Sequence, residues 1–321
     1  MDNTTLSVRV SRRASEATDI DVFELVAADT AVPLPRYEAG AHIDVHLPGG
    51  LVRQYSLCGP PENGQAYRIA VLRDVHGRGG SRAMHASVQA GDLIRIGRPR
   101  NAFALKSTTQ PACLLAGGVG ITPLIAMAYQ LQAVGTAFEL HCFARSRDRL
   151  AFQAELAGTR LRQHAVLHLD DEPAPAAHSL DHVVDSVAAE TAVYACGPAG
   201  FLKRIGDLVA QRPAPRPAYH FESFSPPAVA SGQSTFTLFF AKSLKTVTVE
   251  GNETIVAAAA RVGIEIPVSC EQGICGTCLT PVLDGVPDHR DMFLTDDEHR
   301  LNQAMTPCCS RALSDALTLD L

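Results

Sequence analysis

The sequence lacks tryptophan, long apolar runs and basic tracts. None of its 321 residues falls in a run approaching the ~18–20 apolar residues of a membrane-spanning helix, so we expect no membrane association. The formal net charge is −6 and the basic residues are scattered, which argues against nucleic acid as a partner. Without tryptophan, aromatic contacts to a ligand must come from Phe and Tyr.

We also expect no secretory leader. The chain begins Met1-Asp2-Asn3, with no charged and then apolar segment behind it. We therefore expect a cytoplasmic protein whose nine cysteines stay reduced. The acidic excess is local: residues 234–321 hold 12 acidic and 6 basic side chains, whereas residues 1–233 hold 22 of each. Such a C-terminal module is either merely well solvated or steered towards a basic patch on an electron acceptor.

The cysteines near the C-terminus carry the strongest signal. Cys270, Cys275 and Cys278 follow the spacing C-x4-C-x2-C, and a further cysteine comes at Cys308 or Cys309. This is the arrangement of plant-type [2Fe–2S] ferredoxins. A structural zinc site fits poorly, because such sites usually pair two C-x2–4-C units, whereas here 29 residues separate Cys278 from Cys308. The loop predicts a one-electron cluster, with its fourth ligand open between two adjacent cysteines.

The hydrophobic pattern divides the chain into segments. Residues 1–107 show short alternating strands and one short helix, which predicts an antiparallel β-barrel. Residues 108–225 alternate apolar strands with helices, which predicts an α/β domain with an open parallel sheet. Residues 226–233 have the composition of a linker. Residues 234–321 combine two strands, a helix and the cysteine loop, as in an α+β plant-type ferredoxin domain.

Two motifs in the first segment predict a flavin site. One strand carries a guanidinium for a phosphate, an aromatic face and a hydroxyl, although so short a motif is as often ordinary strand sequence. The residues of this strand motif are Arg53, Gln54, Tyr55 and Ser56. A glycine-rich turn then leads into the short helix and offers a phosphate site at a helix N-terminus. The residues of that turn include Gly79, Gly80 and Ser81. Together the two motifs predict bound flavin mononucleotide (FMN).

A second glycine-rich turn follows the buried strand at residues 112–116. It reads GGVGITP, and Pro123 stands where the third glycine of G-x-G-x-x-G would be. We expect Thr122 to cap the following helix, and Gly118 and Gly120 to let a pyrophosphate approach the backbone. A turn of this kind behind a parallel strand predicts a nicotinamide dinucleotide.

Other residues of the second segment are candidates for binding the nicotinamide or the adenosine ribose of that dinucleotide. Cys196 and Gly197 stand at a strand tip, where ligands of parallel sheets bind, although a buried cysteine is often only packing. Arg145 follows the second strand, where an arginine favours NADP and an acid favours NAD; the nearby Asp148 leaves the choice open. Phe224 either covers the flavin or packs the domain edge.

Taken in order, R-x-Y-S, the second glycine-rich turn, C-G-P and the ferredoxin cysteines make the chain resemble the phthalate dioxygenase reductase family, which includes vanillate O-demethylase reductases. The resemblance covers essentially the whole chain. It implies an FMN-binding barrel, an NADH domain and a C-terminal [2Fe–2S] domain, and it favours NADH over NADPH, which stays possible. Through the pattern C-x-S-R-A it selects Cys308 as the fourth cluster ligand.

The resemblance also implies roles for single residues. FMN would be bound by Arg53, Tyr55, Ser56, Gly80 and Ser81. The nicotinamide nucleotide would be bound by Gly118, Gly120, Thr122, Cys196 and Gly197. Phe224 would lie against the flavin.

Electron counting connects these sites. NADH gives up two electrons as a hydride, whereas a plant-type cluster accepts one, so a flavin must stand between them. We expect hydride transfer beside Ser56 and Cys196. Single electrons would then pass through the cluster to a separate oxygenase component. We expect that component to be of the Rieske type and to act on an aromatic acid or a related small molecule. A stand-alone NAD(P)H:flavin reductase or oxidase is the alternative. A pure electron carrier is disfavoured by the two nucleotide motifs.

Overall fold

The computed structural model describes residues 5–75, 77, 79–172, 179–224, 234–268, 273, 276–291 and 293–321. Packing divides the chain into two compact units, Met1–Phe224 and Ser225–Leu321. Two predicted cluster ligands, Cys270 and Cys275, and the predicted linker 226–233 lie outside the described residues. Among the described residues, no helix combines the length and apolar character needed to cross a membrane.

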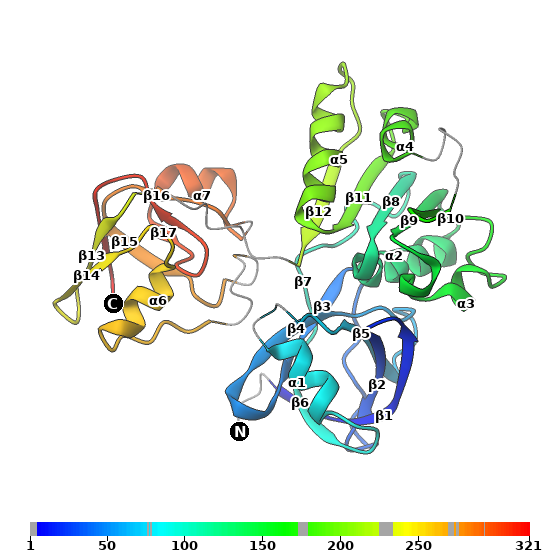
Figure 1. Cartoon of the computed structure of the whole chain (residues 1–321), viewed down its shortest axis with the longest axis horizontal. Coiled ribbons are helices and arrows are strands. Elements are labelled where there is room, and N and C mark those ends of the chain that lie inside the picture. Colours follow the sequence, from blue (N-terminus) through cyan, green and yellow to red (C-terminus); the bar gives the residue numbers. More distant parts are fainter. Residues whose placement is uncertain are drawn as a thin grey trace. The chain divides into compact units, whose positions relative to one another are not determined.

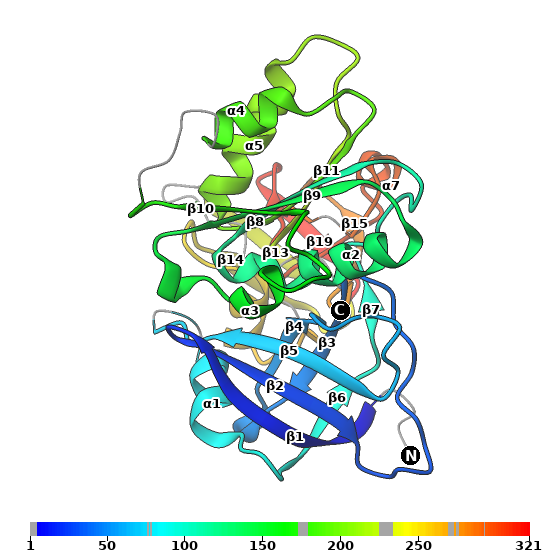
Figure 2. The same cartoon turned by 90° about the vertical axis from the view of Figure 1, so that its right-hand side faces the viewer.

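The N-terminal part of the first unit is a closed antiparallel barrel (Figure 2). Its elements are β1 (Thr5–Ala17), β2 (Ile20–Ala27), β3 (Ala41–His46), η1 (Pro48–Gly50), β4 (Val52–Ser56), β5 (Ala66–Leu72), α1 (Gly80–Ser87), β6 (Leu93–Gly97) and β7 (Arg100–Asn101). The strand order is β4-β3-β6-β1-β2-β5, with β7 beside β3. Leu57, just behind β4, bridges Ile69 of β5 and closes the barrel. Alternate strand residues such as Val8 and Val10 fill its core.

The second part of this unit is a five-stranded parallel sheet (Figure 1). Its elements are β8 (Ala112–Gly117), η2 (Gly118–Gly120), α2 (Ile121–Val134), β9 (Phe138–Ala144), η3 (Arg147–Arg149), α3 (Gln153–Leu156), β10 (Ala165–Leu169), α4 (Leu180–Ser186), β11 (Ala192–Gly197), α5 (Ala199–Gln211) and β12 (Tyr219–Ser223). The strand order is β10-β9-β8-β11-β12. The chain therefore changes direction across the sheet between β8 and β11, and ligands of open parallel sheets bind at such a switch point.

Helices cover both faces of the parallel sheet. Leu114 and Ala116 of β8 belong to the apolar cluster that contains α2, whereas Cys113 and Leu115 pack with α4 and α5. This alternation explains the continuous apolar run of β8, since both of its faces are buried. The α2 cluster also includes barrel residues, among them Ile20 of β2, so the barrel and the parallel sheet share one core.

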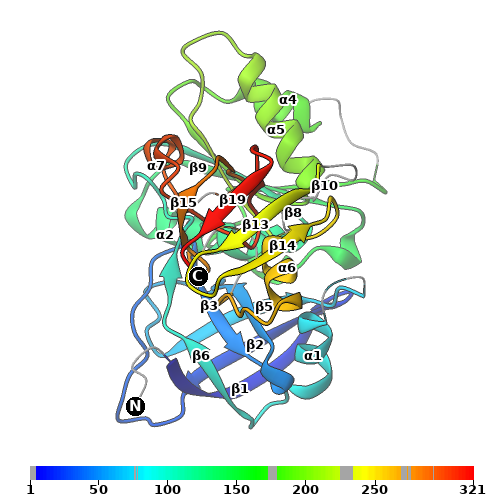
Figure 3. The same ribbon diagram turned by 90° about the vertical axis from the view of Figure 1, so that its left-hand side faces the viewer.

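The second unit is a small mixed sheet with helices (Figure 3). Its elements are β13 (Phe236–Phe240), β14 (Lys245–Val249), α6 (Ile255–Arg261), β15 (Thr280–Asp284), β16 (Pro287–Asp288), α7 (Asp296–Leu301), β17 (Ala304–Met305), β18 (Arg311–Ala312) and β19 (Ala316–Leu319). The sheet order is β14-β13-β19-β15-β17, and β16 pairs with β18. Thr295 and Glu298 form a capping box that starts α7.

Local patterns mispredict two elements of the first unit. Apolar periodicity over residues 152–161 indicates a helix, but only Gln153–Leu156 is α-helical. Phe152 has a left-handed backbone (φ 62°), so the helix cannot begin there. The strand β12 lacks a clear alternating pattern and is recognised only through its pairing with β11. The fold class itself, a barrel, a parallel α/β sheet and a ferredoxin-like module, is confirmed.

Candidate functional site

The strand motif and the first glycine-rich turn meet at the N-terminus of α1. A Cβ placed on Gly80 would overlap the Arg53 side chain, which therefore lies across the first residue of the helix. Gly79 precedes it with a left-handed backbone (φ 84°) and caps α1 without a side-chain hydrogen bond. Ser81 Oγ accepts a hydrogen bond from the Asp74 amide at 3.1 Å. A guanidinium beside a helix N-terminus is an arrangement that can bind a phosphate, and phosphate binding here stays a prediction.

The rest of the strand motif presents polar atoms beside this cradle. Tyr55 Oη is shielded from solvent and has no hydrogen-bond partner among the described residues. Burial raises the pKa of Tyr55 to about 12, so its hydroxyl keeps its proton. Gln54 Nε2 donates to Asp44 Oδ1 at 3.1 Å. A buried hydroxyl without a hydrogen-bond partner beside this cradle fits a flavin, because the flavin ring has polar atoms along its edge.

The second glycine-rich turn packs directly on the C-G-P turn. A Cβ on Gly120 would collide with the backbone carbonyl of Cys196, and a Cβ on Gly197 would come 3.0 Å from the Gly117 Cα. Gly118 has a left-handed backbone (φ 56°) and open space around it. The two turns behind the adjacent strands β8 and β11 thus pack backbone to backbone at the switch point, and open space remains at Gly118. The open position at Gly118 fits a pyrophosphate, which needs close approach to backbone N–H groups.

The predicted cap at Thr122 is wrong. The helix α2 begins at Ile121, and Gly120 precedes it in the right-handed helical region. The 3-10 turn η2 runs straight into α2, so Thr122 is already the second helical residue and its hydroxyl donates to Val119 O at 3.1 Å. Pro123 fits in the first turn, where a helix needs no N–H donor.

A residue absent from the predicted site joins the barrel to the parallel sheet. Glu222 on β12 pairs in register with Cys196 on β11, and its carboxylate accepts a hydrogen bond from Ser56 Oγ at 3.4 Å. Ser56 belongs to the barrel strand β4, so the three side chains converge from both halves of the unit. All three are buried. The sequence contained one signal for Glu222: it is an acidic residue among aromatic ones, in a segment that ends at the carboxyl edge of the parallel sheet.

Burial dominates the electrostatics of this cluster. Desolvation raises the pKa of Glu222 to about 8, with the Ser56 hydrogen bond acting in the opposite direction. Desolvation and the neighbouring Glu222 hold the pKa of Cys196 well above that of an ordinary thiol. Both groups are therefore protonated at neutral pH. Glu222 is a buried carboxylic acid able to hold or release a proton near neutrality.

Replacing Glu222 with glutamine should flatten the pH dependence of stability. The native pKa lies above the unfolded one, so the stability that the neutral acid contributes is complete below about pH 4.5 and is lost as pH rises to about 8. Glutamine cannot ionise, so we expect the stability of Glu222→Gln to match that of the parent at about pH 4 and to exceed it by up to about 4 kcal/mol at pH 8. Thermal unfolding of the first unit across this range is the measurement, and equal pH slopes in both proteins contradict the prediction.

The remaining candidates lie around the same edge. Phe224 directly follows β12 and is partly exposed. Arg145 follows β9 with an exposed side chain. The neighbouring Arg147 is bound by Glu172: Nη2 reaches Oε1 at 2.9 Å and Oε2 at 3.2 Å. Asp148 Oδ2 accepts from Thr18 Oγ1 at 2.6 Å and so attaches this loop to the barrel.

The cysteine loop belongs to the second unit. Cys278, Cys308 and Cys309 are buried there. Gly273 and Gly276 have left-handed backbones, as expected for a tightly curled loop, and a Cβ on Gly273 would come 2.5 Å from Cys309 Sγ. Cys309 Sγ also lies 3.2 Å from Thr306 Oγ1. Adjacent buried sulfurs at the loop fit a cluster site made of thiolates.

Known proteins match the sequences of both units. Residues 239–313 match the family model described as "2Fe-2S iron-sulfur cluster binding domain". The vanillate O-demethylase oxidoreductase of Acinetobacter baylyi is 43% identical over 303 residues, which cover 94% of each chain. The phthalate dioxygenase reductase of Burkholderia cepacia is 36% identical over 98% of this chain and 97% of that protein. The chain belongs to this oxidoreductase family.

Solved structures place the whole chain in the same family. The structure of phthalate dioxygenase reductase, described as modular for electron transfer from pyridine nucleotides to [2Fe–2S], matches with a TM-score of 0.74, 35% identity and 99% coverage of this chain. An intact type IV self-sufficient cytochrome P450 monooxygenase matches with a TM-score of 0.80 and 38% identity. This chain spans 41% of that longer one. The family members are flavin- and iron–sulfur-containing oxidoreductases, and this chain has both modules.

Proposed function

We propose that this chain is the reductase component of a multicomponent oxygenase. It takes two electrons from NADH, and passes them singly through a [2Fe–2S] cluster to a separate oxygenase protein. The observation that carries the proposal is the convergence of Ser56, Cys196 and Glu222 where the barrel meets the parallel sheet, in a chain that also holds a ferredoxin domain. That convergence puts the flavin cradle and the nucleotide turns on either side of one buried cluster.

The barrel residues would hold FMN. Arg53 and the α1 N-terminus, with Gly79, Gly80 and Ser81, would bind its phosphate. Tyr55, Gln54 and Ser56 would contact its ring, and the Tyr55 hydroxyl would gain the partner that it lacks. Bound there, the flavin supplies the conversion of a hydride into single electrons. The phosphate of FMN ends at this cradle, and the sequence offers no aromatic segment for the adenine of FAD.

The parallel sheet would hold NADH across its switch point. Gly118, Gly120 and Thr122 would receive the pyrophosphate, and Gly197 and Cys196 would face the nicotinamide. Phe224 would cover the flavin until the nicotinamide displaces it. Around the reacting atoms, Ser56 and the neutral Glu222 exclude water and hold a proton within reach of Ser56 Oγ.

Glu172 should determine the preference for NADH. Arg147 stands where a 2′-phosphate would be read, but the Glu172 carboxylate already occupies its guanidinium. We expect Glu172→Gln to raise kcat/KM for NADPH about fivefold, since exposed ion pairs are worth roughly 1 kcal/mol or less. The value for NADH should change less than about twofold.

A matched control is available for this specificity test. Asp181→Asn removes an equally exposed ion pair, that with Arg204, and should change neither coenzyme's kcat/KM. An unchanged NADPH value in Glu172→Gln would show that Arg147 does not read the 2′ position, and Arg145 would then be tested by the same assay.

The electron acceptor is proposed to be a Rieske-type oxygenase that acts on an aromatic acid or a related small molecule. Relatives named for vanillate O-demethylase and phenoxybenzoate dioxygenase support an oxygenase partner. The acidic surplus of residues 234–321 suits a basic docking face on that partner. A cytoplasmic location is part of this proposal, because cluster thiolates must stay reduced until the cluster is built.

The test is rapid mixing of the anaerobic purified protein with NADH or NADPH. We expect flavin absorbance to bleach first and cluster absorbance to follow, faster with NADH, and mass analysis of the released flavin to give FMN. A flavin that bleaches while the cluster stays oxidised would favour the stand-alone flavin reductase. Release of a flavin bearing AMP would contradict the assignment of the cradle.

A further inference from the structure

Two large apolar side chains lie exposed beside the cysteine loop of the second unit. Phe293 is 42% exposed and Leu279 is 41% exposed. Both lie against the loop at Gly276: a Cβ added there would overlap the tip of the Phe293 ring, and the Leu279 amide donates to Gly276 O at 2.9 Å. Leu279 also directly follows the predicted cluster ligand Cys278. We call Phe293 and Leu279 the loop rim.

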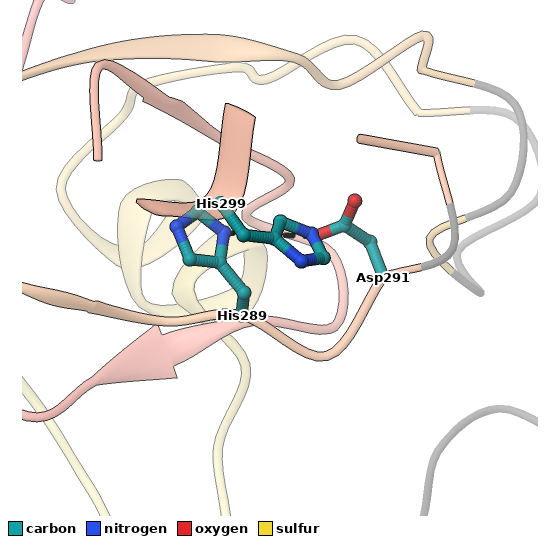
Figure 4. Close-up of side chains that lie close together, drawn as sticks. All are labelled: His289, Asp291 and His299. Atoms are coloured by element: carbon teal, nitrogen blue, oxygen red, sulfur yellow. Dashed lines mark ion pairs between the residues drawn. The ribbon is translucent and has the colours of Figure 1, made fainter. Parts of the chain in front are cut away.

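A buried carboxylate holds Phe293 in place. Asp291 Oδ2 accepts a hydrogen bond from the Leu294 amide at 2.9 Å, which closes a turn around Phe293. The Asp291 side chain has no exposed surface, and His299 Nε2 lies 3.3 Å from its Oδ1 (Figure 4). The same turn packs on the cysteine loop, since a Cβ on Gly273 would come 2.8 Å from Asp291 Cα. Phe293 is therefore presented to solvent from a fixed turn, and little conformational freedom is lost when a protein binds there.

The loop rim has the properties of a small docking surface. Scattered exposed apolar residues are ordinary, but here two of them meet at one glycine of the cysteine loop. Aromatic side chains are enriched at protein interfaces, and a central one carries much of the binding energy. Electron-transfer partners bury less than about 1,200 Å² in total, so a small apolar centre is enough. A protein that approaches the loop at Gly276 meets the rim.

The helix α7 adds negative charge beside the rim. It begins three residues after Phe293 and has the sequence DDEHRL, with three acidic residues and one arginine. Hydrogen bonds from the Thr295 backbone and side chain lower the pKa of Glu298, so this exposed carboxylate is charged at neutral pH. Residues 1–233 balance 22 acidic side chains with 22 basic ones. Long-range attraction therefore favours a separate basic protein over the chain's own first unit.

We propose that the loop rim docks a separate electron-accepting protein whose matching face is apolar at its centre and basic around it. The inference rests on the proposed function, in which single electrons leave the chain for an oxygenase. Phe293 is at the centre of the contact and Leu279 extends it. The carboxylates of α7 lie at its edge, where charges speed association more than they add affinity. Docking brings the acceptor against the loop that bears Cys278, and the acceptor gains the single electron that the reduced chain loses.

Binding is measured on the oxidised full-length protein with its flavin and cluster, with ferric cytochrome c, a basic acceptor protein, as the probe. Calorimetry at low ionic strength should give a Kd for the parent that rises as salt is added. We expect Phe293→Ala to raise this Kd about tenfold, because it removes the central aromatic ring. Phe293→Leu keeps an apolar side chain and should raise it less than about threefold. Asp297→Asn removes an exposed charge of α7 and should weaken the salt dependence.

Electron transfer in the same variants separates docking from the internal steps. On mixing with NADH, flavin and cluster absorbance should bleach at the parental rates, with two irons per chain. Ferricyanide, a small acceptor that needs no docking surface, should be reduced as by the parent. The second-order rate constant for cytochrome c should fall about tenfold in Phe293→Ala. Leu279→Ala should lower it about threefold, which keeps the test available if Phe293→Ala binds too little iron.

Leu244→Ala is the matched control. Leu244 lies in the same unit, between β13 and β14, and is 78% exposed. Its truncation removes even more exposed apolar surface, but not at the cysteine loop. This variant should equal the parent in Kd and in every rate.

Three results would overturn the proposal. The first is a parent that does not bind cytochrome c at low ionic strength. The second is a parental Kd in both Phe293→Ala and Leu279→Ala. The third is slower bleaching of the cluster by NADH with an unchanged Kd, which would assign the rim to electron entry from the flavin. Failure of the proposed function is seen separately, as a parent whose cluster NADH does not reduce, and the Kd of the oxidised proteins does not depend on that step.

Discussion

Replacing Cys308 with serine is expected to abolish NADH-driven reduction of cytochrome c while reduction of the flavin by NADH continues at the parental rate. A plant-type cluster needs four thiolates, and serine is a poor substitute at neutral pH. The flavin and nucleotide residues belong to the first unit, so losing the cluster leaves them in place. Iron content, cluster absorbance and the two rates are measured on the same preparation.

Cys309→Ser is the matched control, because its sulfur is also buried beside the loop. Cys309 Sγ lies 3.2 Å from Thr306 Oγ1, and a serine hydroxyl can make the same contact. We expect this variant to keep two irons and its cytochrome c activity. If the two variants exchange behaviour, Cys309 is the ligand. If Cys308→Ser loses its iron but still reduces cytochrome c, single electrons leave from the flavin and the relay is wrong.

Gly120→Ala should disable the nucleotide site without emptying the flavin site. The added Cβ would meet the carbonyl carbon and oxygen of Cys196 and lie 2.7 Å from the Gly197 nitrogen. These are backbone atoms of the adjacent central strand, so the two turns must part. Overpacking costs about 1–3 kcal/mol, and we expect kcat/KM for NADH to fall by roughly ten- to a hundredfold. Bound flavin per chain should not change, since its cradle lies on β4 and α1.

Gly64→Ala is the control, because the same substitution there meets no neighbouring atoms. Nothing lies within 4 Å of a Cβ at Gly64, which is in the loop before β5. Its kinetics and flavin content should equal those of the parent. Steady-state NADH oxidation with saturating acceptor gives kcat and KM for all three proteins. Equal kcat/KM for Gly120→Ala and the parent would show that the turn at Gly120 is not where NADH binds.

Sequence patterns located those backbone features that depend on a few neighbouring residues. The glycine turn at the start of α1 was predictable because Gly79 and Gly80 open a short helix, and the structure brings Arg53 against it; phosphate binding there stays a prediction. The turn after β8 was predictable for the same reason, since glycines behind an apolar strand indicate close backbone approach. The cap at Thr122 failed because the 3-10 turn η2 merges with α2, a detail that composition does not encode.

By itself the sequence determined the cysteine spacing, the glycine turns and the class of each fold, because these depend on intervals along the chain. Only the tertiary structure decided that Glu222 meets Ser56, that Glu172 occupies Arg147, and that His299 faces Asp291. The first pair is separated by 166 residues. Burial and pairing across such distances arise from packing, and packing is what turns an ordinary glutamate into an acid with a pKa of about 8.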